Sequence, residues 1–153
     1  MTVRLSTGLR NALAGATGFS GALETGVIYV YTGAQPATAD AAVTGTLLGT
    51  VTKDGNAWAA GSATNGLEFA AAANGSIAKE PAHVWKFTGV AAGTAGWFRF
   101  VGNAADAGGT STTLPRLDGT VGTANADLNM SNVTIAIGTP VTIDTFSFTI
   151  PAA

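Results

Sequence analysis

The clearest alternation of apolar and polar side chains lies between residues 84 and 101, which read VWKFTGVAAGTAGWFRFV. Two aromatic-rich arms flank a segment, residues 89–96, that is rich in glycine and alanine. A period of two residues is typical of strands with one buried face. The pattern therefore predicts an antiparallel β-hairpin whose inner face belongs to the core.

The parity of the two arms predicts the faces, because successive side chains of a strand point to opposite sides. The predicted inward residues are Trp85, Phe87, Phe98 and Phe100. Trp97 and Arg99 then share the outer face, with Lys86 outward on the other arm. An exposed Trp–Arg pair can contact a partner protein or a sugar ring. In the alternative, which we favour, the Arg stem lies along the sheet and the Trp packs under a loop.

Apolar residues recur at helical spacing near the amino terminus, and they predict a short amphipathic helix over residues 3–14. Its apolar positions are Leu5, Leu9, Ala12 and Leu13. Thr2 or Ser6 is the expected amino-terminal cap, and Gly15 the expected end.

So short a helix is not stable alone. It either covers its own domain or docks on a neighbouring subunit. In the second case Leu5, Leu9 and Leu13 are candidate partner contacts, together with Trp97 and Arg99.

Residues 15–25 are rich in glycine and alanine and are predicted to be a linker. The predicted organisation is thus an amino-terminal helix or arm with linker (1–25) and a β domain (26–153). The run GVIYVY (26–31) is almost continuously apolar, which is typical of a strand covered on both sides. The expected cover for its second face is the amino-terminal helix or another subunit.

Further strands are predicted where short β-branched or aromatic runs are bounded by turn-forming residues. They span residues 47–52, 116–121, 128–130, 133–137 and 141–150, with short pieces at Trp58 and 67–69. Asp54-Gly55 marks a turn. In the last strand the apolar parity changes between Ile143 and Phe146, which predicts a β-bulge at Asp144-Thr145. Many short strands with one short helix predict an all-β fold, an antiparallel jelly-roll-like β-sandwich.

Composition narrows the class of protein. Only 10% of the residues are charged and the formal net charge is −2, whereas about a quarter are charged in an average soluble domain. The seven Lys and Arg residues are dispersed, so no nucleic-acid surface is predicted. No apolar run suits a membrane span or a signal peptide, and we expect synthesis in the cytoplasm. A surface so poor in charge is common in a subunit packed against copies of itself or a larger assembly.

Few residues offer chemistry. The chain has no cysteine and one histidine, His83, so a cysteine nucleophile and a His/Cys metal site are excluded by count. Glu80 is the only carboxylate near His83 in sequence, and we interpret His83 as structural or exposed. The carboxylates show no calcium-loop pattern, and the glycine-rich stretches lack the ending of a phosphate loop. No catalytic residue, metal or cofactor is predicted.

Four segments together resemble a known family. They are GVIYVYTGAQPATADAAVTGTLL (26–48), VWKFTGVAAGTAGWFRF (84–100), RLDGTVGTANADLNM (116–130) and TFSFTIP (145–151). In this order they resemble the capsid cement, or decoration, proteins of tailed bacteriophages. The resemblance covers most of the chain from about residue 26 onward.

The resemblance implies a jelly-roll-like β domain on the outside of a phage head. It implies a non-enzymatic virion protein that bridges major capsid subunits, acts as a homodimer or homotrimer, and binds neither nucleic acid nor membrane. The alternative is a tail- or fibre-associated module that recognises a host glycan through exposed aromatic residues such as Trp97. A hydrolytic enzyme that uses His83 and Glu80 is a third interpretation.

Overall fold

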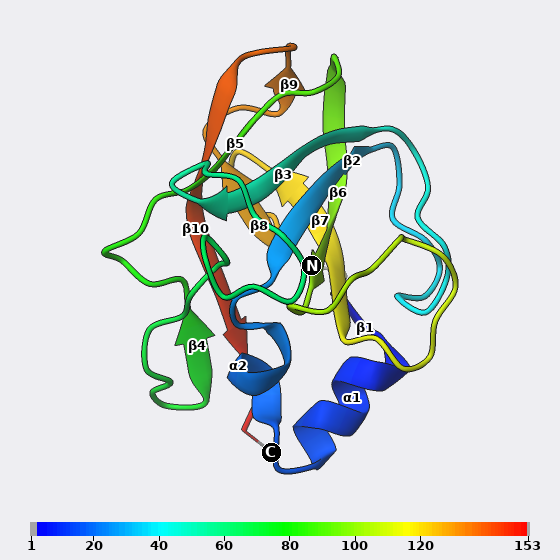
Figure 1. Cartoon of the computed structure of the whole chain (residues 1–153), viewed down its shortest axis with the longest axis vertical. Coiled ribbons are helices and arrows are strands. Elements are labelled where there is room, and N and C mark those ends of the chain that lie inside the picture. The colour runs from blue at the N-terminus through cyan, green and yellow to red at the C-terminus, as the bar shows by residue number, and fades with distance from the viewer. Residues whose placement is uncertain (1–2, 153) are drawn as a thin grey trace.

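The computed structural model of the chain describes residues 3–152, and this part forms ten strands and two short helices. The helices are α1 (Thr7–Ala14) and α2 (Gly18–Leu23). The strands are β1 (Arg4–Leu5), β2 (Val27–Thr32), β3 (Leu47–Lys53), β4 (Ser76–Ala78), β5 (Trp85–Thr88), β6 (Gly93–Val101), β7 (Arg116–Gly122), β8 (Leu128–Met130), β9 (Thr134–Ile135) and β10 (Pro140–Thr149). The predicted all-β class is confirmed (Figure 1).

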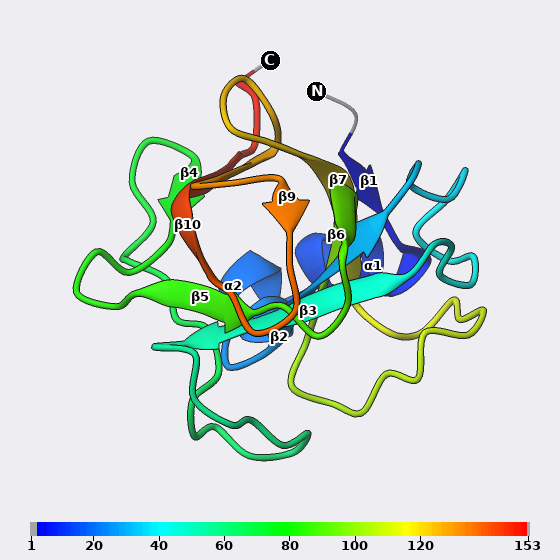
Figure 2. The same cartoon turned by 90° about the horizontal axis from the view of Figure 1, so that it is seen from above.

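Seven of these strands close into a barrel. The ring runs from β2 through β3, β5, β10, β8, β7 and β6 back to β2, and Figure 2 shows it from above. All pairs in the ring are antiparallel except β7 with β8. β1, β4 and β9 lie outside the ring and pair with β7, β10 and β6. The jelly-roll-like sandwich expected from the sequence is not confirmed.

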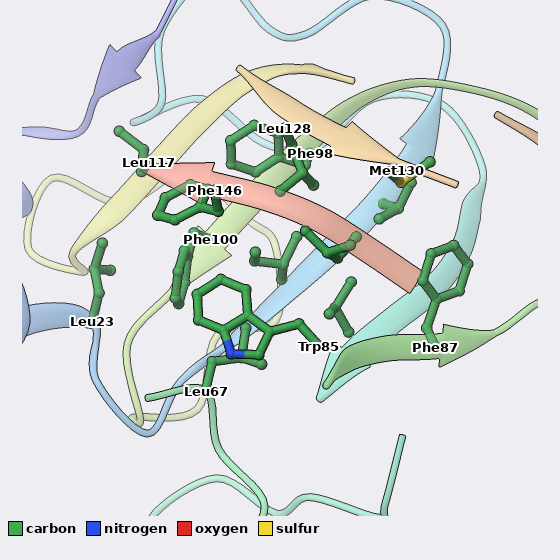
Figure 3. Close-up of a cluster of buried hydrophobic side chains, with 14 of the residues drawn as sticks. Leu23, Leu67, Trp85, Phe87, Phe98, Phe100, Leu117, Leu128, Met130 and Phe146 are labelled. Carbon is green, nitrogen blue, oxygen red and sulfur yellow. The ribbon is translucent and has the colours of Figure 1, made fainter. Parts of the chain in front are cut away.

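Aromatic side chains fill the barrel (Figure 3). The Trp85 ring lies 6.0 Å from that of Phe100, and the Phe100 ring lies 5.6 Å from that of Phe146. Phe98 and Phe100 are completely buried, and Phe87 is almost so. Each such side chain contributes about 1.5–3 kcal/mol when it leaves water. The inner faces predicted for the two aromatic arms are therefore confirmed.

The predicted hairpin of residues 84–101 is wrong. β5 pairs with β3 and β10, whereas β6 pairs with β2, β7 and β9, so the two arms are not neighbours in the sheet. Alternation identifies the buried face of each strand but not the strand beside it. Residues 89–92 instead lie against the turn before β10, where Gly89 N donates to Thr139 O over 3.0 Å.

The predicted bulge in the last strand is confirmed. The register of β10 against β8 shifts between Ile143 and Thr145. Val141 and Ile143 point into the barrel before the shift, and Phe146 does so after it. One extra residue thus keeps both halves of a long strand facing the core.

The amino-terminal segment belongs to the same core. The helix begins later than predicted because Arg4–Leu5 pairs with β7 as β1. Ser6 caps α1, and its hydroxyl accepts from Leu9 N at 3.1 Å and Arg116 N at 2.9 Å and donates to Leu114 O at 2.8 Å. Gly15 follows the last turn as expected. Thr2, the other predicted cap, lies outside the described residues.

Four further segments differ from the prediction. Residues 15–25 are not all linker, because α2 forms there and buries Phe19 and Leu23 in the core. Trp58 and residues 67–69 form no strand beyond an isolated bridge between Phe69 and Lys79. β4 was not predicted. Glycine and alanine dominate these stretches, so the apolar pattern there is weak, and packing against the barrel decides their structure.

Gly49 on β3 provides a test of the barrel packing. A methyl group at this position would overlap the ring of Phe87 on the neighbouring strand. We predict that Gly49→Ala lowers the free energy of unfolding by about 1–3 kcal/mol, because the packed ring must shift. Urea denaturation measures this change.

Gly109→Ala is the matched control. A methyl group there meets no atom within 4 Å, and we expect a change below about 1 kcal/mol. Equal effects of the two substitutions would contradict the packing described for β3 and β5.

Candidate docking face

Two long loops cover the outer face of β2, β6 and β7. Residues 33–46 join β2 to β3, and residues 102–115 join β6 to β7 (cyan and yellow-green in Figure 1). Neighbouring antiparallel strands are usually joined by about 2–5 residues, and longer loops without regular structure are often functional. The loops bond to each other, Val43 N to Gly108 O and Ser111 N to Asp40 O, both over 2.9 Å.

Long side chains from the strands below hold the first loop in place. Each donates to one backbone carbonyl of the loop. The donors and acceptors are Arg4 to Pro36 (2.6 Å), Arg116 to Ala39 (3.4 Å), Arg99 to Ala41 (3.0 Å) and Trp97 to Thr44 (3.3 Å). A loop whose carbonyls are bound by fixed donors loses little further entropy when it contacts a partner.

A buried ion pair anchors this arrangement. Arg99 on β6 and Asp118 on β7 lie opposite each other, and two hydrogen bonds of 2.7 Å join them. Their side chains are 1% and 0% exposed. Burial raises the pKa of Asp118 above its ordinary value, against the lowering effect of the Arg99 hydrogen bonds. Arg99 also lies over Trp97, 5.5 Å from its ring centre, so its charge has contacts on several sides.

A second buried pair holds the other loop. Arg116 at the start of β7 makes two 2.6 Å hydrogen bonds to Asp106, a member of residues 102–115. Both side chains are almost fully buried. Removing one partner of such a pair is strongly destabilising, since the other charge remains buried without compensation. The pair therefore fixes the second loop on the barrel.

Asp40 connects the first loop to α1. Its carboxylate accepts from Thr7 N at 2.8 Å and from Thr7 Oγ1 at 2.7 Å. These hydrogen bonds from Thr7 hold the pKa of Asp40 below its ordinary value. A negative charge at this point also suits the amino-terminal end of a helix.

Every exposed residue of the two loops is glycine, alanine or threonine. They are Gly33, Ala34, Ala37, Thr38, Ala42, Thr44, Gly45, Thr46, Ala104, Ala105, Ala107, Gly109, Thr110, Thr112 and Thr113. We call this surface the docking face. None of these exposed residues is charged: Asp106 is buried in its pair with Arg116, and Asp40 is half-buried and accepts from Thr7. Small side chains on a fixed backbone allow another surface to approach closely.

The docking face covers the apolar strand of residues 26–31. Tyr31 is 7% exposed and stacks on Trp97 with ring centres 4.7 Å apart. Burial raises the pKa of Tyr31 to about 12. The amino-terminal helix, one of the two covers expected from the sequence, packs against α2 and β7 instead. The loops of the same chain lie on these rings.

The predicted contact residues support the docking face or the core. Trp97 and Arg99 lie on the outer face of β6 as predicted, and the favoured interpretation, Trp under a loop and Arg along the sheet, agrees with the structure. Leu9 is fully buried, and Leu5 and Leu13 are partly buried against the core.

The two loops were not predicted as a site. A signal was present, because Asp40 and Asp106 are the only charged residues in otherwise uncharged stretches, and they bond to Thr7 of α1 and Arg116 of β7.

His83 lies beside Glu68 rather than Glu80. Its Nδ1 is 3.6 Å from Glu68 Oε2, and Lys53 Nζ is 2.9 Å from Glu68 Oε1. Glu80 accepts instead from Ala82 N. This cluster connects the end of β3 to residues 68–83. Within residues 3–152, no three His, Cys, Asp or Glu side chains are grouped so that they could hold a metal ion.

A shallow groove of about 530 Å³ lies on the outer face of β2, β3 and β5. It is uncharged, and aromatic and hydroxyl groups line it, among them Tyr29, Thr50, Thr52 and Trp58. Burial raises the pKa of Tyr29, with a further contribution from Asp106, so its hydroxyl stays neutral over the usual pH range.

Comparisons with models of protein families, with curated proteins and with solved structures find no match for this chain. Of the helices in residues 3–152, none has the length and apolar character needed to cross a membrane.

The buried pair under the docking face provides a second test. We predict that Arg99→Leu lowers the free energy of unfolding by about 3–5 kcal/mol at neutral pH, because Asp118 stays buried without its partner. Arg99→Leu combined with Asp118→Leu should recover much of the loss. Chemical denaturation of the single and double variants measures both values.

The free energy of unfolding of Arg99→Leu should also depend on pH. A carboxyl group whose pKa is raised on folding binds more protons in the folded state, so stability falls as pH rises through that pKa. Without Arg99 the pKa of Asp118 rises further, and the deficit of Arg99→Leu should shrink as pH is lowered toward 4. A deficit that does not vary with pH would contradict a charged Asp118 as its cause.

Proposed function

We propose that this chain is a non-enzymatic structural protein of a phage virion, which decorates the outside of the capsid and bridges major capsid subunits. The observation that carries the proposal is the docking face, an uncharged surface of small residues that buried ion pairs hold rigid. Rigidity reduces the entropy lost on binding, and small side chains permit close contact with a large, preformed surface.

The distribution of charge supports the same proposal. Few residues are charged, and several of these are buried in pairs: Arg99, Asp118, Arg116 and Asp106. The rest of the surface has few charges, and charge is what normally keeps protein molecules from associating with one another. Such a surface suits a protein that functions within an assembly, where symmetry repeats one modest interface many times.

The resemblance to phage decoration proteins supplies the identity of the assembly. The same resemblance implies a jelly-roll-like fold, a homodimer or homotrimer and a location on the capsid surface. We include all three in the proposal. The major capsid protein is the proposed partner.

A prediction follows for the docking face. Ala42→Arg and Ala105→Arg place long charged side chains on exposed positions of the two loops, and each should weaken binding to capsids that lack the protein by about tenfold or more. Melting temperature should not change. Co-sedimentation with such capsids measures the affinity.

Ala136→Arg is the matched control, since Ala136 is exposed beside β9 and away from the loops. Capsids with bound protein should also resist heat better than capsids without it. Unchanged thermal stability of the particle would reject the cementing role, and equal binding of all three variants would reject this face.

A second candidate function, recognition of a neutral glycan on a phage tail or fibre, is favoured by the groove beside Trp58 and Tyr29. Aromatic rings and hydroxyl groups without charge suit a sugar. Trp97, the residue first considered for this role, is fully buried and has no accessible ring face.

The two functions make different predictions. If the groove binds a glycan, Trp58→Ala should abolish binding on a glycan array while Ala42→Arg leaves it intact. Absence of any glycan binding by the unaltered protein, together with co-purification with capsids, would reject this candidate. Because Trp58 Nε1 donates to Thr25 O at 2.9 Å, the melting temperature of the variant must be measured in parallel.

A further inference from the structure

The closed ring does not extend to the end of β10, because in residues 3–152 no strand fills the space between β1 and Ser147–Thr149. One edge of β7 faces β6, and the other pairs with β8 at Val121–Gly122 and with β1 at Leu117–Asp118. β8 links this edge to β10 only as far as Phe146. The last residues of β10, Ser147–Thr149, pair with β4 on one side. Within residues 3–152 no strand pairs with them on the other side.

A groove of about 270 Å³ occupies this place. Val3, Phe98, Leu117 and Phe148 contribute its apolar surface, and Asp127 and Asn129 contribute polar groups. Val3 and Phe148 are only partly buried, although both pack against the core. The groove therefore leaves part of Val3 and Phe148 open to solvent.

The end of β10 turns free backbone groups toward the groove. Ile150 N donates to Gly75 O at 2.9 Å, and Phe146 O accepts from Lys79 N at 3.1 Å. Even-numbered residues here thus direct their backbone groups toward β4. Because alternate residues of a strand point their N–H and C=O groups to opposite edges, Thr149 directs its own toward the groove.

β1 forms the opposite edge in the same way. Arg4 pairs with Asp118, and Ser6 N donates to Arg116 O at 3.0 Å. Leu5 lies between Arg4 and Ser6, and Val3 precedes Arg4. These two residues therefore turn their backbone groups away from β7. Two strand edges with free groups thus lie on either side of an apolar floor, which is the arrangement that an added strand recognises.

We propose that this groove, the strand slot between β1 and Ser147–Thr149, binds an extended peptide segment of another protein as an added β-strand. Main-chain hydrogen bonds to Thr149 would give affinity, and alternate apolar side chains would cover the exposed parts of Val3 and Phe148. Each strand in residues 3–152 already pairs with another strand of the same chain, so the proposed occupant is a segment of another protein and not a second copy.

The chemistry of the slot restricts the segment. Asp127 lines it and is 8% exposed, with Oδ2 accepting from Thr120 N and Oγ1, both at 2.9 Å. A buried carboxylate repels acidic side chains, so the segment is neutral or basic with apolar residues at every second position. That the segment belongs to a capsid subunit rests on the proposed function.

Thr149→Pro is the decisive variant. Proline removes the N–H that faces the slot and leaves the bonds of Phe146 and Ile150 toward β4 in place, and proline is tolerated at strand edges. Thr149→Val is the matched control, because it keeps the N–H and loses only a hydroxyl that contacts Ser76 Oγ at 3.0 Å. Both variants should melt close to the unaltered protein.

The probe is a synthetic peptide, acetyl-Lys-Thr-Val-Thr-Val-Thr-Lys-amide, added to the isolated protein and followed by amide hydrogen exchange. In the free protein the Thr149 amide should exchange rapidly and the Ile150 amide slowly. The peptide should slow exchange at Thr149 by about tenfold or more. Thr149→Val should bind the peptide like the unaltered protein, and Thr149→Pro should not.

A Thr149 amide already protected in the free protein, or equal peptide binding by both variants, overturns the strand slot. So does absence of protection at millimolar peptide. Capsid binding separates this result from the proposed function: capsids that bind both variants equally exclude the slot as the contact but leave decoration standing. If capsids bind neither the unaltered protein nor either variant, while the peptide still binds the unaltered protein, decoration is rejected and the strand slot stands.

Discussion

The buried pair of Arg99 and Asp118 is the interaction on which the outer half of the molecule depends. Two opposite charges lie on adjacent strands where water is excluded, and each needs the other because an unpaired buried charge is very unfavourable. Arg99 satisfies this requirement and also bonds to Ala41 O. The pair thereby determines where the first loop lies. With Arg116 and Asp106, it converts two long glycine- and alanine-rich loops into a fixed surface.

The barrel interior follows a simpler constraint. Aromatic side chains from β5, β6 and β10 fill the space inside the barrel. The rest of the chain therefore needs few large side chains to complete the packing. This separation explains how so much of the sequence can consist of glycine, alanine and threonine. The core is concentrated in a few strands, and the remaining residues form connections and surface.

Local patterns predicted the faces of the strands but not their neighbours. Phe98 and Phe100 were assigned inward and Arg99 outward from parity alone, and the bulge at Asp144 followed from a change of parity. The partner of β6 could not be predicted, because pairing depends on contacts across the whole chain. α2 was missed since Phe19 and Leu23 are its only strong apolar signal. The docking face was missed because Asp40 and Asp106 reveal their role only when Thr7 and Arg116 lie beside them.

The hydroxyl of Ser6 links segments that are far apart in the sequence. It bonds to Leu9 nearby and to Leu114 and Arg116, which follow it by 108 and 110 positions. The cap of α1 itself is local, but the bonds to Leu114 and Arg116 exist only when the start of β7 lies beside Ser6. The amino-terminal helix is thus fastened to the barrel by contacts of very high sequence separation, so a substitution that displaces the start of β7 would also loosen the first helix of the chain.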